Sequence, residues 1–414
     1  MSTIFDIAII RCGELLTLSG ASTHPKRRAE LADVGLILNG AIGISGEKIA
    51  WVGSEAAYRQ IGRAKLEIDA GGKVVMPGLV DPHTHAVFAG SREGEWEEKM
   101  RGVSYLEILE KGGGILRTVD ATRAASPEHL LNRAKKTLKK MLSHGTTTVE
   151  IKSGYGLDQK NELKLLEVIQ KLKEETPLDV VLTFLGAHAI PREYLNDPDA
   201  YVDLVIGMLS EVKPGAQFCD VFCEEGAFSY AQTRRVLAQA LITGYQVKLH
   251  AGEFSDQGGI RLAVEFGAVS VDHLDAIQEN EIPLLAESGA VGVLLPGVSH
   301  FLRMKEIPPA RALIEGGVPI ALASDFNPGS CPSLSMQEMI HLAVRNLGLS
   351  TSEAIAAATI NAAHAIGMAS RVGSLEVGKQ ADLLLLDIDH YQQLPYYFGL
   401  NHVDKVIKKG KMVL

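Results

Sequence analysis

The spacing of apolar and polar residues divides the chain into three parts. From residue 1 to about 75, short segments alternate apolar and polar positions between glycine or asparagine turns, which predicts β-strands. Short β-branched runs then alternate with longer segments of helical spacing, such as the amphipathic stretch at 127–145, up to about residue 366. After that the β pattern returns. The middle part therefore predicts βα units around a parallel sheet.

Eight apolar runs in the middle part are the expected strands. They span residues 74–81, 146–154, 180–188, 218–225, 246–252, 270–274, 290–297 and 319–325. Eight strands with intervening helices are typical of a (β/α)8 barrel. We therefore predict an α/β protein with a barrel at 76–371, inserted into a small β-sandwich domain that combines residues 1–75 with residues 372–414.

Composition and charge narrow the class of protein. Hydrophobic residues make up 46% and charged residues 22%, as in ordinary globular proteins. The net charge of −9 lies in stretches of mixed sign, so we expect no nucleic-acid partner. No apolar run is long enough to span a membrane, and the N-terminus lacks a signal-peptide pattern. Four scattered cysteines do not suggest a disulfide framework, so we expect a cytoplasmic protein with buried thiols: Cys12, Cys219, Cys223 and Cys331.

Polar side chains follow the apolar runs, at the strand ends where barrels carry their active sites. The first run ends in Asp81-Pro82-His83-Thr84-His85. Residues i and i+2 of an extended chain face the same side, so both imidazoles can point into the barrel mouth. A single His-x-His pair is weak evidence for a metal site, and two hydrogen-bonded loop histidines are the alternative.

His250 and Asp325 strengthen the metal interpretation, because they end the fifth and eighth expected strands. Together with His83 and His85 they would bring three imidazoles and one carboxylate to one point. Catalytic metal ions usually have about three or four protein ligands and a position for water, whose pKa they lower toward about 7. This ligand set suits zinc or iron and does not distinguish between them.

The combined motifs resemble the amidohydrolase superfamily over essentially the whole chain. The resemblance rests on PGLVDPHTH, the later strand-end histidines and aspartate, and the closing segment GSLEVGKQADLLLLD. It implies metal-dependent hydrolysis. Superfamily members with two metals carry a carboxylated lysine on the fourth strand, and residues 218–225 contain none, so one metal ion per subunit is favoured. Lys152 and Lys248 are expected to be structural, paired with Glu150 or another acid.

Six segments resemble the imidazolonepropionase family within that superfamily: HTHAVFAGSRE, EIKSGYGLD, FLGAHAIP, HAGEFSD, VDHLD and SDFNPGS. The implied reaction is hydrolysis of the ring amide C–N bond of 4-imidazolone-5-propanoate to N-formimidoyl-L-glutamate, in L-histidine breakdown. A superfamily deaminase of a nucleobase-like heterocycle and a non-catalytic scaffold are the alternatives. The superfamily also suggests a homodimer.

The implied substrate has a carboxylate tail, which assigns further roles. Arg92 would hold the carboxylate by a charge-assisted contact, although an ion pair with Glu93 or Glu95 is the alternative from sequence alone. The turn after Asp325 would offer backbone N–H groups to an anion, with its serine as a helix N-cap. The full set of expected substrate contacts is Arg92, Tyr155, His188, Glu253, Asn327, Gly329 and Ser330, with Tyr105 a weaker candidate.

Three residues are expected to act in catalysis by moving protons. His273 would orient or deprotonate the attacking water, and Asp325 would share its proton. Glu253 would pass a proton to the departing ring nitrogen. His188 would help to stabilise the developing oxyanion. The alternative for Glu253 and His273 is that they orient neighbouring groups without transferring protons.

Overall fold

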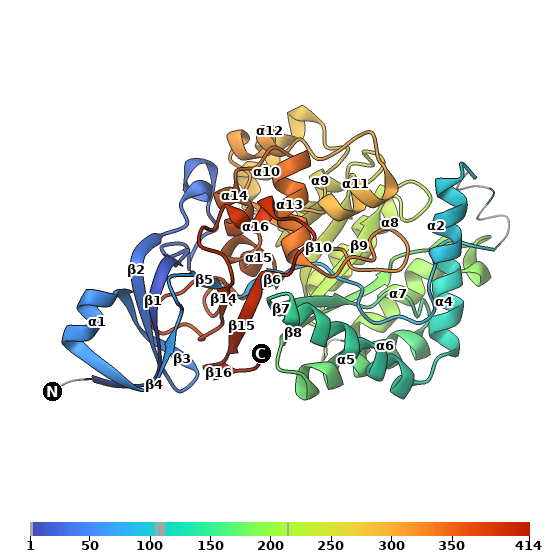
Figure 1. The fold of residues 1–414 in the computed structure, drawn as a ribbon. Helices are drawn as coiled ribbons and strands as arrows, with labels where there is room; N and C mark the ends of the chain where they lie inside the picture. The colour runs from blue at the N-terminus through green and yellow to red at the C-terminus, as the bar shows by residue number, and fades with distance from the viewer. Residues whose placement is uncertain (1–2, 104–106, 108–111, 213–214) are drawn as a thin grey trace.

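A computed structural model describes residues 3–103, 107, 112–212 and 215–414. The described residues form two hydrogen-bonded sheets of eight strands each. In Figure 1 the blue N-terminal strands and the red C-terminal strands lie together on the left, and the second sheet lies on the right among most of the helices. The predicted barrel with a separate sheet built from both chain ends is therefore confirmed.

The first sheet joins strands from the two ends of the chain. Its strands are β1 (Thr3–Leu16), β2 (Leu36–Ser45), β3 (Lys48–Ser54), β4 (Gly62–Asp69), β5 (Val74–Pro77), β14 (Leu383–Leu386), β15 (Val403–Lys408) and β16 (Lys411–Met412). β5 connects the two ends, because it pairs in parallel with β1 and antiparallel with β14. β1 pairs with β4 along its first part and with β5 near its end. Buried Ile9, Leu15 and Leu383 belong to the apolar core of this sheet.

The second sheet is the barrel. Its parallel strands are β6 (Leu79–Asp81), β7 (Thr146–Lys152), β8 (Asp179–Ala187), β9 (Phe218–Cys223), β10 (Gln246–Ala251), β11 (Ser270–His273), β12 (Val291–Leu294) and β13 (Ile320–Leu322). The barrel is closed by backbone hydrogen bonds between the segments that follow β6 and β13. There the Asp325 amide donates to the His83 carbonyl, and the His85 amide donates to the Phe326 carbonyl, both at 3.0 Å.

The predicted first strand, 74–81, is in fact two strands that belong to different sheets. β5 pairs with the chain-end strands and β6 pairs with β7. The change occurs at Gly78, where a Cβ atom would lie 2.2 Å from the Thr147 hydroxyl oxygen. Only glycine lets the backbone pass β7 this closely. Sequence spacing alone did not reveal this change, and the boundaries at 75/76 and 371/372 stay a prediction.

Helices lie between the strands. Their bounds are α1 (Glu55–Ile61), α2 (Glu93–Met100), α4 (Ile115–Ala124), α5 (Pro127–Ser143), α6 (Gln159–Glu175), α7 (Pro198–Val212), α8 (Tyr230–Ile242), α9 (Gly259–Glu265), α10 (Ile282–Ser288), α11 (Pro296–Leu302), α12 (Ala310–Gly316), α13 (Met336–Asn346), α14 (Thr351–Ala357), α15 (Ile360–Ala365) and α16 (Gln393–Tyr396). Short 3-10 helices span Arg28–Ala32, Arg192–Tyr194 and Glu279–Glu281. α5 is the helix predicted at 127–145; Ser126 caps its first turn, and its apolar face is buried. None of these described helices is both long and apolar enough to cross a membrane.

Buried charges tie the barrel to the chain-end sheet. Asp179, at the start of β8, accepts from Lys408 at 2.7 Å and pairs with Lys409 at 2.9 Å. Lys408 also pairs with Asp382 at 2.6 Å. Burial alone would raise the pKa of Asp179, but the neighbouring Lys408 ammonium outweighs it and the pKa falls to about 2. These contacts fix the sheet on the face of the barrel where β8 begins.

Candidate active site

A cavity of about 760 Å³ lies where the barrel strands end. The sequence-predicted site residues that line it are His85, Arg92, Tyr155, His188, His250, Glu253, His273, Asp325, Asn327, Gly329 and Ser330. His83 is fully buried next to this set. Tyr105 lies outside the described residues. The barrel therefore brings together side chains that are far apart in the sequence.

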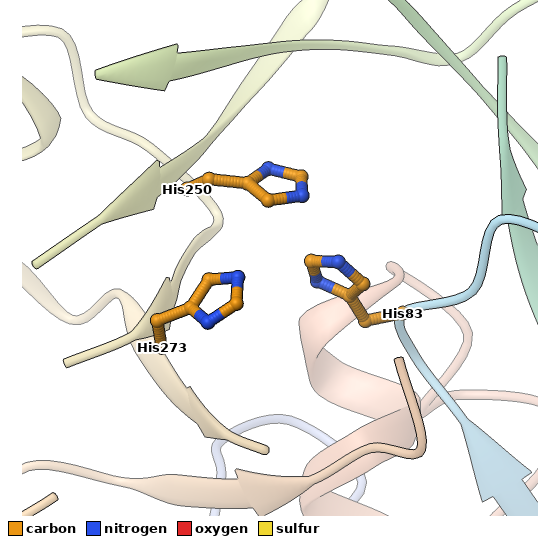
Figure 2. A group of neighbouring side chains, drawn as sticks. All are labelled: His83, His250 and His273. Atoms are coloured by element: carbon orange, nitrogen blue, oxygen red, sulfur yellow. The ribbon is translucent and has the colours of Figure 1, made fainter. Parts of the chain in front are cut away.

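Three histidines from separate strand ends form the centre of the site. His83 follows β6, His250 lies in β10 and His273 ends β11. Their ring centroids are 4.4 to 5.7 Å apart, and Figure 2 shows the three rings turned toward one another. Their ligand atoms lie within 4.8 Å of one another, as do those of His83, His85 and Asp325. The sequence-based ligand set did not include His273, which belongs to the first of these two groups.

The donor atoms of this cluster fit a divalent cation. Among the described residues, His83 Nε2, both ring nitrogens of His250 and Asp325 Oδ1 are buried without a hydrogen bond. The Nε2 atoms of His83 and His85 each lie 3.4 Å from Asp325 Oδ1. An unsatisfied buried polar atom costs about 1–3 kcal/mol, so several together indicate a missing ligand. Imidazole and carboxylate are ligands typical of zinc and iron.

Burial sets the charge state of these ligands. It lowers the pKa of His83, His85 and His250 well below the usual range, so their rings are neutral and have lone pairs to offer. Burial also raises the pKa of Asp325 to about 8. A cation beside Asp325 would favour its carboxylate form and offset that effect.

A buried ionic network beneath the cluster orients its ligands. His83 Nδ1–H donates to Asp272 at 2.6 Å, which turns Nε2 toward the cluster. Lys152 pairs with Asp220 at 2.7 Å and with Glu150 at 3.0 Å, and Lys248 pairs with Glu150 at 2.9 Å. Both lysines are therefore structural, as predicted.

Sequence reasoning overlooked the two aspartates of this network. Asp220 and Asp272 occupy fully buried positions in β9 and β11. An acidic residue inside an otherwise apolar run is the signal that could have identified them. The next residue, His273, has a φ of 88°, and Asp325 has a φ of 49°. Such backbone strain is concentrated at functional sites.

Arg92 both forms an ion pair and faces the cavity, the two alternatives that the sequence left open. Its Nε donates to Glu95 at 2.9 Å, so the ion pair expected as the alternative exists, yet the guanidinium also lines the cavity. Gly329 lies against the other side of the group. A Cβ atom at Gly329 would be 2.0 Å from Arg92 Nη1.

The turn after Asp325 differs from the prediction in two ways. Asn327 Oδ1 accepts from the Gly329 and Ser330 amides at 2.7 and 2.8 Å, so those N–H groups already have a partner and do not serve an anion. The next helix, α13, is capped by Ser335 and not by Ser330. Instead, the Ser330 hydroxyl donates toward Asp325 Oδ2 at 3.3 Å. The turn therefore supports the aspartate and leaves its side chains to line the cavity.

Tyr155 and His188 form one wall. His188 stacks on His85 with centroids 4.8 Å apart, and Tyr155 lies 5.3 Å from His188. His188 Nδ1–H donates to the Gly154 carbonyl at 3.0 Å, and burial lowers the ring's pKa to about 4. A neutral ring fixed in this tautomer presents a lone pair at Nε2. It can accept a hydrogen bond there, which differs from the predicted stabilisation of an oxyanion.

A buried glutamate holds the Tyr155 loop. Glu162, fully buried in α6, accepts from the amides of Gly154, Gly156 and Leu157 at 3.1, 2.7 and 2.9 Å. Leu157 has a φ of 52°, a conformation that the loop keeps only because its surroundings impose it. Sequence reasoning did not identify Glu162.

Glu253 and His273 are neighbours at the cavity, but they do not form a direct hydrogen bond. Glu253 Oε2 lies 3.6 Å from His273 Nε2. Burial, with the nearby Asp325 carboxylate, raises the pKa of Glu253 well above its usual range, and burial lowers that of His273 to about 4. Glu224 accepts from the Phe254 amide at 3.0 Å and so anchors the segment that carries Glu253.

Comparison with known proteins agrees with this geometry. The sequence matches the Amidohydrolase family over residues 74–413. It is 48% identical over 414 residues to the imidazolonepropionase of Alkaliphilus oremlandii (strain OhILAs), covering 99% of this chain and 98% of that protein. It is 49% identical over 411 residues to the imidazolonepropionase of Geobacillus kaustophilus (strain HTA426), covering 98% of this chain and 97% of that protein. The fold resembles an adenosine deaminase from Xanthomonas campestris with bound Zn, with a TM-score of 0.76 at 21% identity, covering 100% of this chain and 94% of that one.

Proposed function

The chain belongs to the amidohydrolase family and, within it, to the imidazolonepropionases, and we propose the roles that its residues take in that reaction. The reaction is hydrolysis of the ring amide C–N bond of 4-imidazolone-5-propanoate to N-formimidoyl-L-glutamate, the third step of L-histidine breakdown. One observation carries the assignment of the site: a buried cluster of ligand atoms without hydrogen bonds shares a cavity with the Arg92 guanidinium.

The ligands of the proposed metal ion are His83, His85, His250 and Asp325. A cation held there would polarise the ring carbonyl and lower the pKa of a water molecule. We propose one ion per subunit, either zinc or iron. The orientation of His83 by Asp272 supports this set. For His273, which lies in the same cluster, we propose the role of orienting the attacking water, not that of a required ligand.

The propionate tail is held by other residues that line the same cavity. Arg92 binds the carboxylate through its Nη atoms, since Glu95 already occupies Nε. Tyr155 and the side chains of Asn327 and Ser330 complete this part of the pocket, and Gly329 leaves room for the guanidinium. His188 accepts a hydrogen bond from a ring N–H of the substrate at its free Nε2.

Proton transfer accompanies the break of the C–N bond. Water adds to the ring carbonyl carbon, and Asp325 or His273 accepts its proton. Glu253, protonated in its buried position, donates a proton to the departing ring nitrogen. The proton taken from the attacking water restores the protonated form of Glu253; His273, 3.6 Å from Glu253, would pass it on through one bridging water.

We further propose that the protein acts in the cytoplasm, as a homodimer. The location is supported by the cysteines, which are all buried and form no disulfide among the described residues. The dimer follows only from the resemblance to the superfamily. Light scattering on the purified protein at two concentrations tests it, and a monomer mass at both would contradict it.

Two assays run in parallel test the function. Metal-loaded protein should remove the absorbance of 4-imidazolone-5-propanoate and form N-formimidoyl-L-glutamate without releasing ammonia. Release of ammonia from a nucleobase-like heterocycle, with the imidazolone untouched, would favour the deaminase alternative. Asp325→Asn should abolish the activity, whereas Asp120→Asn, at an exposed position in α4, should retain it.

A further inference from the structure

Glu95 is a buried carboxylate beside Arg92 that the proposed reaction does not use directly. Its side chain is 6% exposed. Glu95 Oε2 accepts from Arg92 Nε at 2.9 Å and from the Gly114 amide at 3.1 Å, and Glu95 Oε1 lies 3.5 Å from Arg117 Nη1. The carboxylate therefore contacts the substrate-binding arginine at Nε, and Glu95 itself does not line the cavity.

The position of Arg92 makes this contact necessary. Arg92 precedes the first turn of α2, at the helix end where the backbone dipole is positive and a cation is disfavoured. Lys99, which also lines the cavity, adds a second positive charge, and the two repel each other. Of the described residues around Arg92, Glu95 supplies the carboxylate that holds the guanidinium by a direct hydrogen bond.

Gly329 restricts the position of the Arg92 guanidinium at its Nη1 atom. A side chain there would overlap Nη1, so the group fits between Glu95 on one side and the 327–330 turn on the other. A contact at Nε also fixes the plane of a guanidinium, because its five N–H donors have a rigid arrangement. With Nε engaged, the two Nη atoms remain to form a fork for a carboxylate.

We propose that Glu95 is a positioning residue that selects for substrates with a carboxylate tail by fixing Arg92. This inference rests on the proposed function of Arg92 in the same site. Glu95 does not contact the substrate. It acts through the orientation of the guanidinium, so its effect depends on both Arg92 and the ligand's carboxylate.

A binding experiment isolates this role from turnover. The probes are 3-(imidazol-4-yl)propanoate and its uncharged propanamide, titrated into the metal-loaded protein by calorimetry. We expect the wild type to prefer the acid, and we expect Glu95→Gln to reduce that preference about tenfold, mainly by weakening binding of the acid. The matched control is Arg117→Ala, which removes the other charged partner of Glu95 but leaves the Arg92 contact, and should keep the preference.

A double-mutant cycle separates positioning from a general structural effect. In an Arg92→Ala background, Glu95→Gln should not change the ratio of acid to amide affinity any further. An unchanged preference in folded Glu95→Gln, or an equal loss in the Arg92→Ala background, would overturn the proposal.

A second variant covers the case in which Glu95→Gln does not fold. Arg92→Lys keeps the positive charge but cannot form the Nε contact, and it should also lose about tenfold of the preference. Full retention by Arg92→Lys would contradict the proposal. Failure of the proposed function is distinguishable, because it would appear as absence of imidazolone hydrolysis by the wild type while the binding preference could still be measured.

Discussion

Gly329 lies so close to Arg92 that a Cβ atom on the glycine would be 2.0 Å from the arginine Nη1 atom. Gly329 therefore decides where the guanidinium can lie. Its φ is not in the left-handed region, so alanine is compatible with the backbone and only the contact with Arg92 opposes it.

We predict that Gly329→Ala weakens substrate binding without unfolding the protein. The flexible arginine moves away from the new methyl group, so KM for 4-imidazolone-5-propanoate should rise about tenfold through loss of a charge-assisted contact. The unfolding temperature should stay within a few degrees of the wild type. Steady-state kinetics and thermal unfolding measure the two effects. Gly94→Ala, where the added Cβ meets open space, is the control and should keep KM.

Asp272→Asn is predicted to weaken metal binding. The variant loses the charge that holds His83 Nδ1–H, so His83 Nε2 is a poorer and less well oriented ligand. Partners of this kind typically contribute about 10- to 100-fold to metal affinity. Competition with a chromophoric chelator measures the affinity, and Asp120→Asn is the surface control. Equal affinity in the variant and the wild type would show that Asp272 does not orient the ligand.

Glu253→Gln is predicted to lower kcat by about 10²- to 10⁴-fold, because the amide cannot deliver a proton to the departing nitrogen. Metal content, measured on the same sample, should not change. If kcat stays near the wild-type value with the metal bound, the proton-transfer role of Glu253 is wrong. If metal is lost instead, Glu253 supports the ligands.

Glu162→Gln should disturb the Tyr155 loop. The carboxylate accepts from three backbone amides, and the NH₂ group of glutamine would face donors in place of an acceptor. We expect the free energy of unfolding to fall by about 1.5–3 kcal/mol, measured by denaturant titration. Catalytic efficiency should fall as well, because Tyr155 loses its fixed position. Glu167→Gln, at an exposed position five residues further along the same helix, is the control and should leave both values near the wild type.

Stability at acid pH is predicted to depend on Asp179. Its folded-state pKa of about 2 is below its ordinary value of 3.8, so the carboxylate contributes stability above about pH 4, and that contribution is lost as the pH falls toward 2. The contribution is about 2 kcal/mol. Asp179→Asn should therefore be less stable than the wild type at pH 6, with the difference shrinking toward pH 2. Asp69→Asn removes a half-exposed ion pair with Arg11 and should change stability by less than about 1 kcal/mol at either pH.

The fold and much of the candidate site were predictable from the sequence because their signals are local. Strand ends are marked by polar residues after apolar runs, and those residues meet in a barrel whatever their distance along the chain. The cysteines Cys219 and Cys223 were also predictable as buried strand residues, and both lie in β9.

The remaining features depend on contacts between distant segments. Nothing near Gly78 in the sequence shows that Thr147 lies against it, and so the change from one sheet to the other was not foreseen. In the same way, the amides of the 327–330 turn are already engaged because the Asn327 side chain folds back on them. Glu162 was overlooked, and Glu95 was expected only as a surface partner of Arg92, because a glutamate in a helix is normally on the surface and only the packed structure shows that both are buried.

The hydrogen bonds that close the barrel have a consequence for the order of assembly. The backbone groups of His83, His85 and Asp325 form the bonds that join the first barrel strand to the last. During synthesis on the ribosome, His83 and His85 emerge early, but their ring of strands is incomplete until the segment with Asp325 follows. The residues of the proposed metal site therefore come together only after the ends of the barrel have met, so we expect metal to bind after closure.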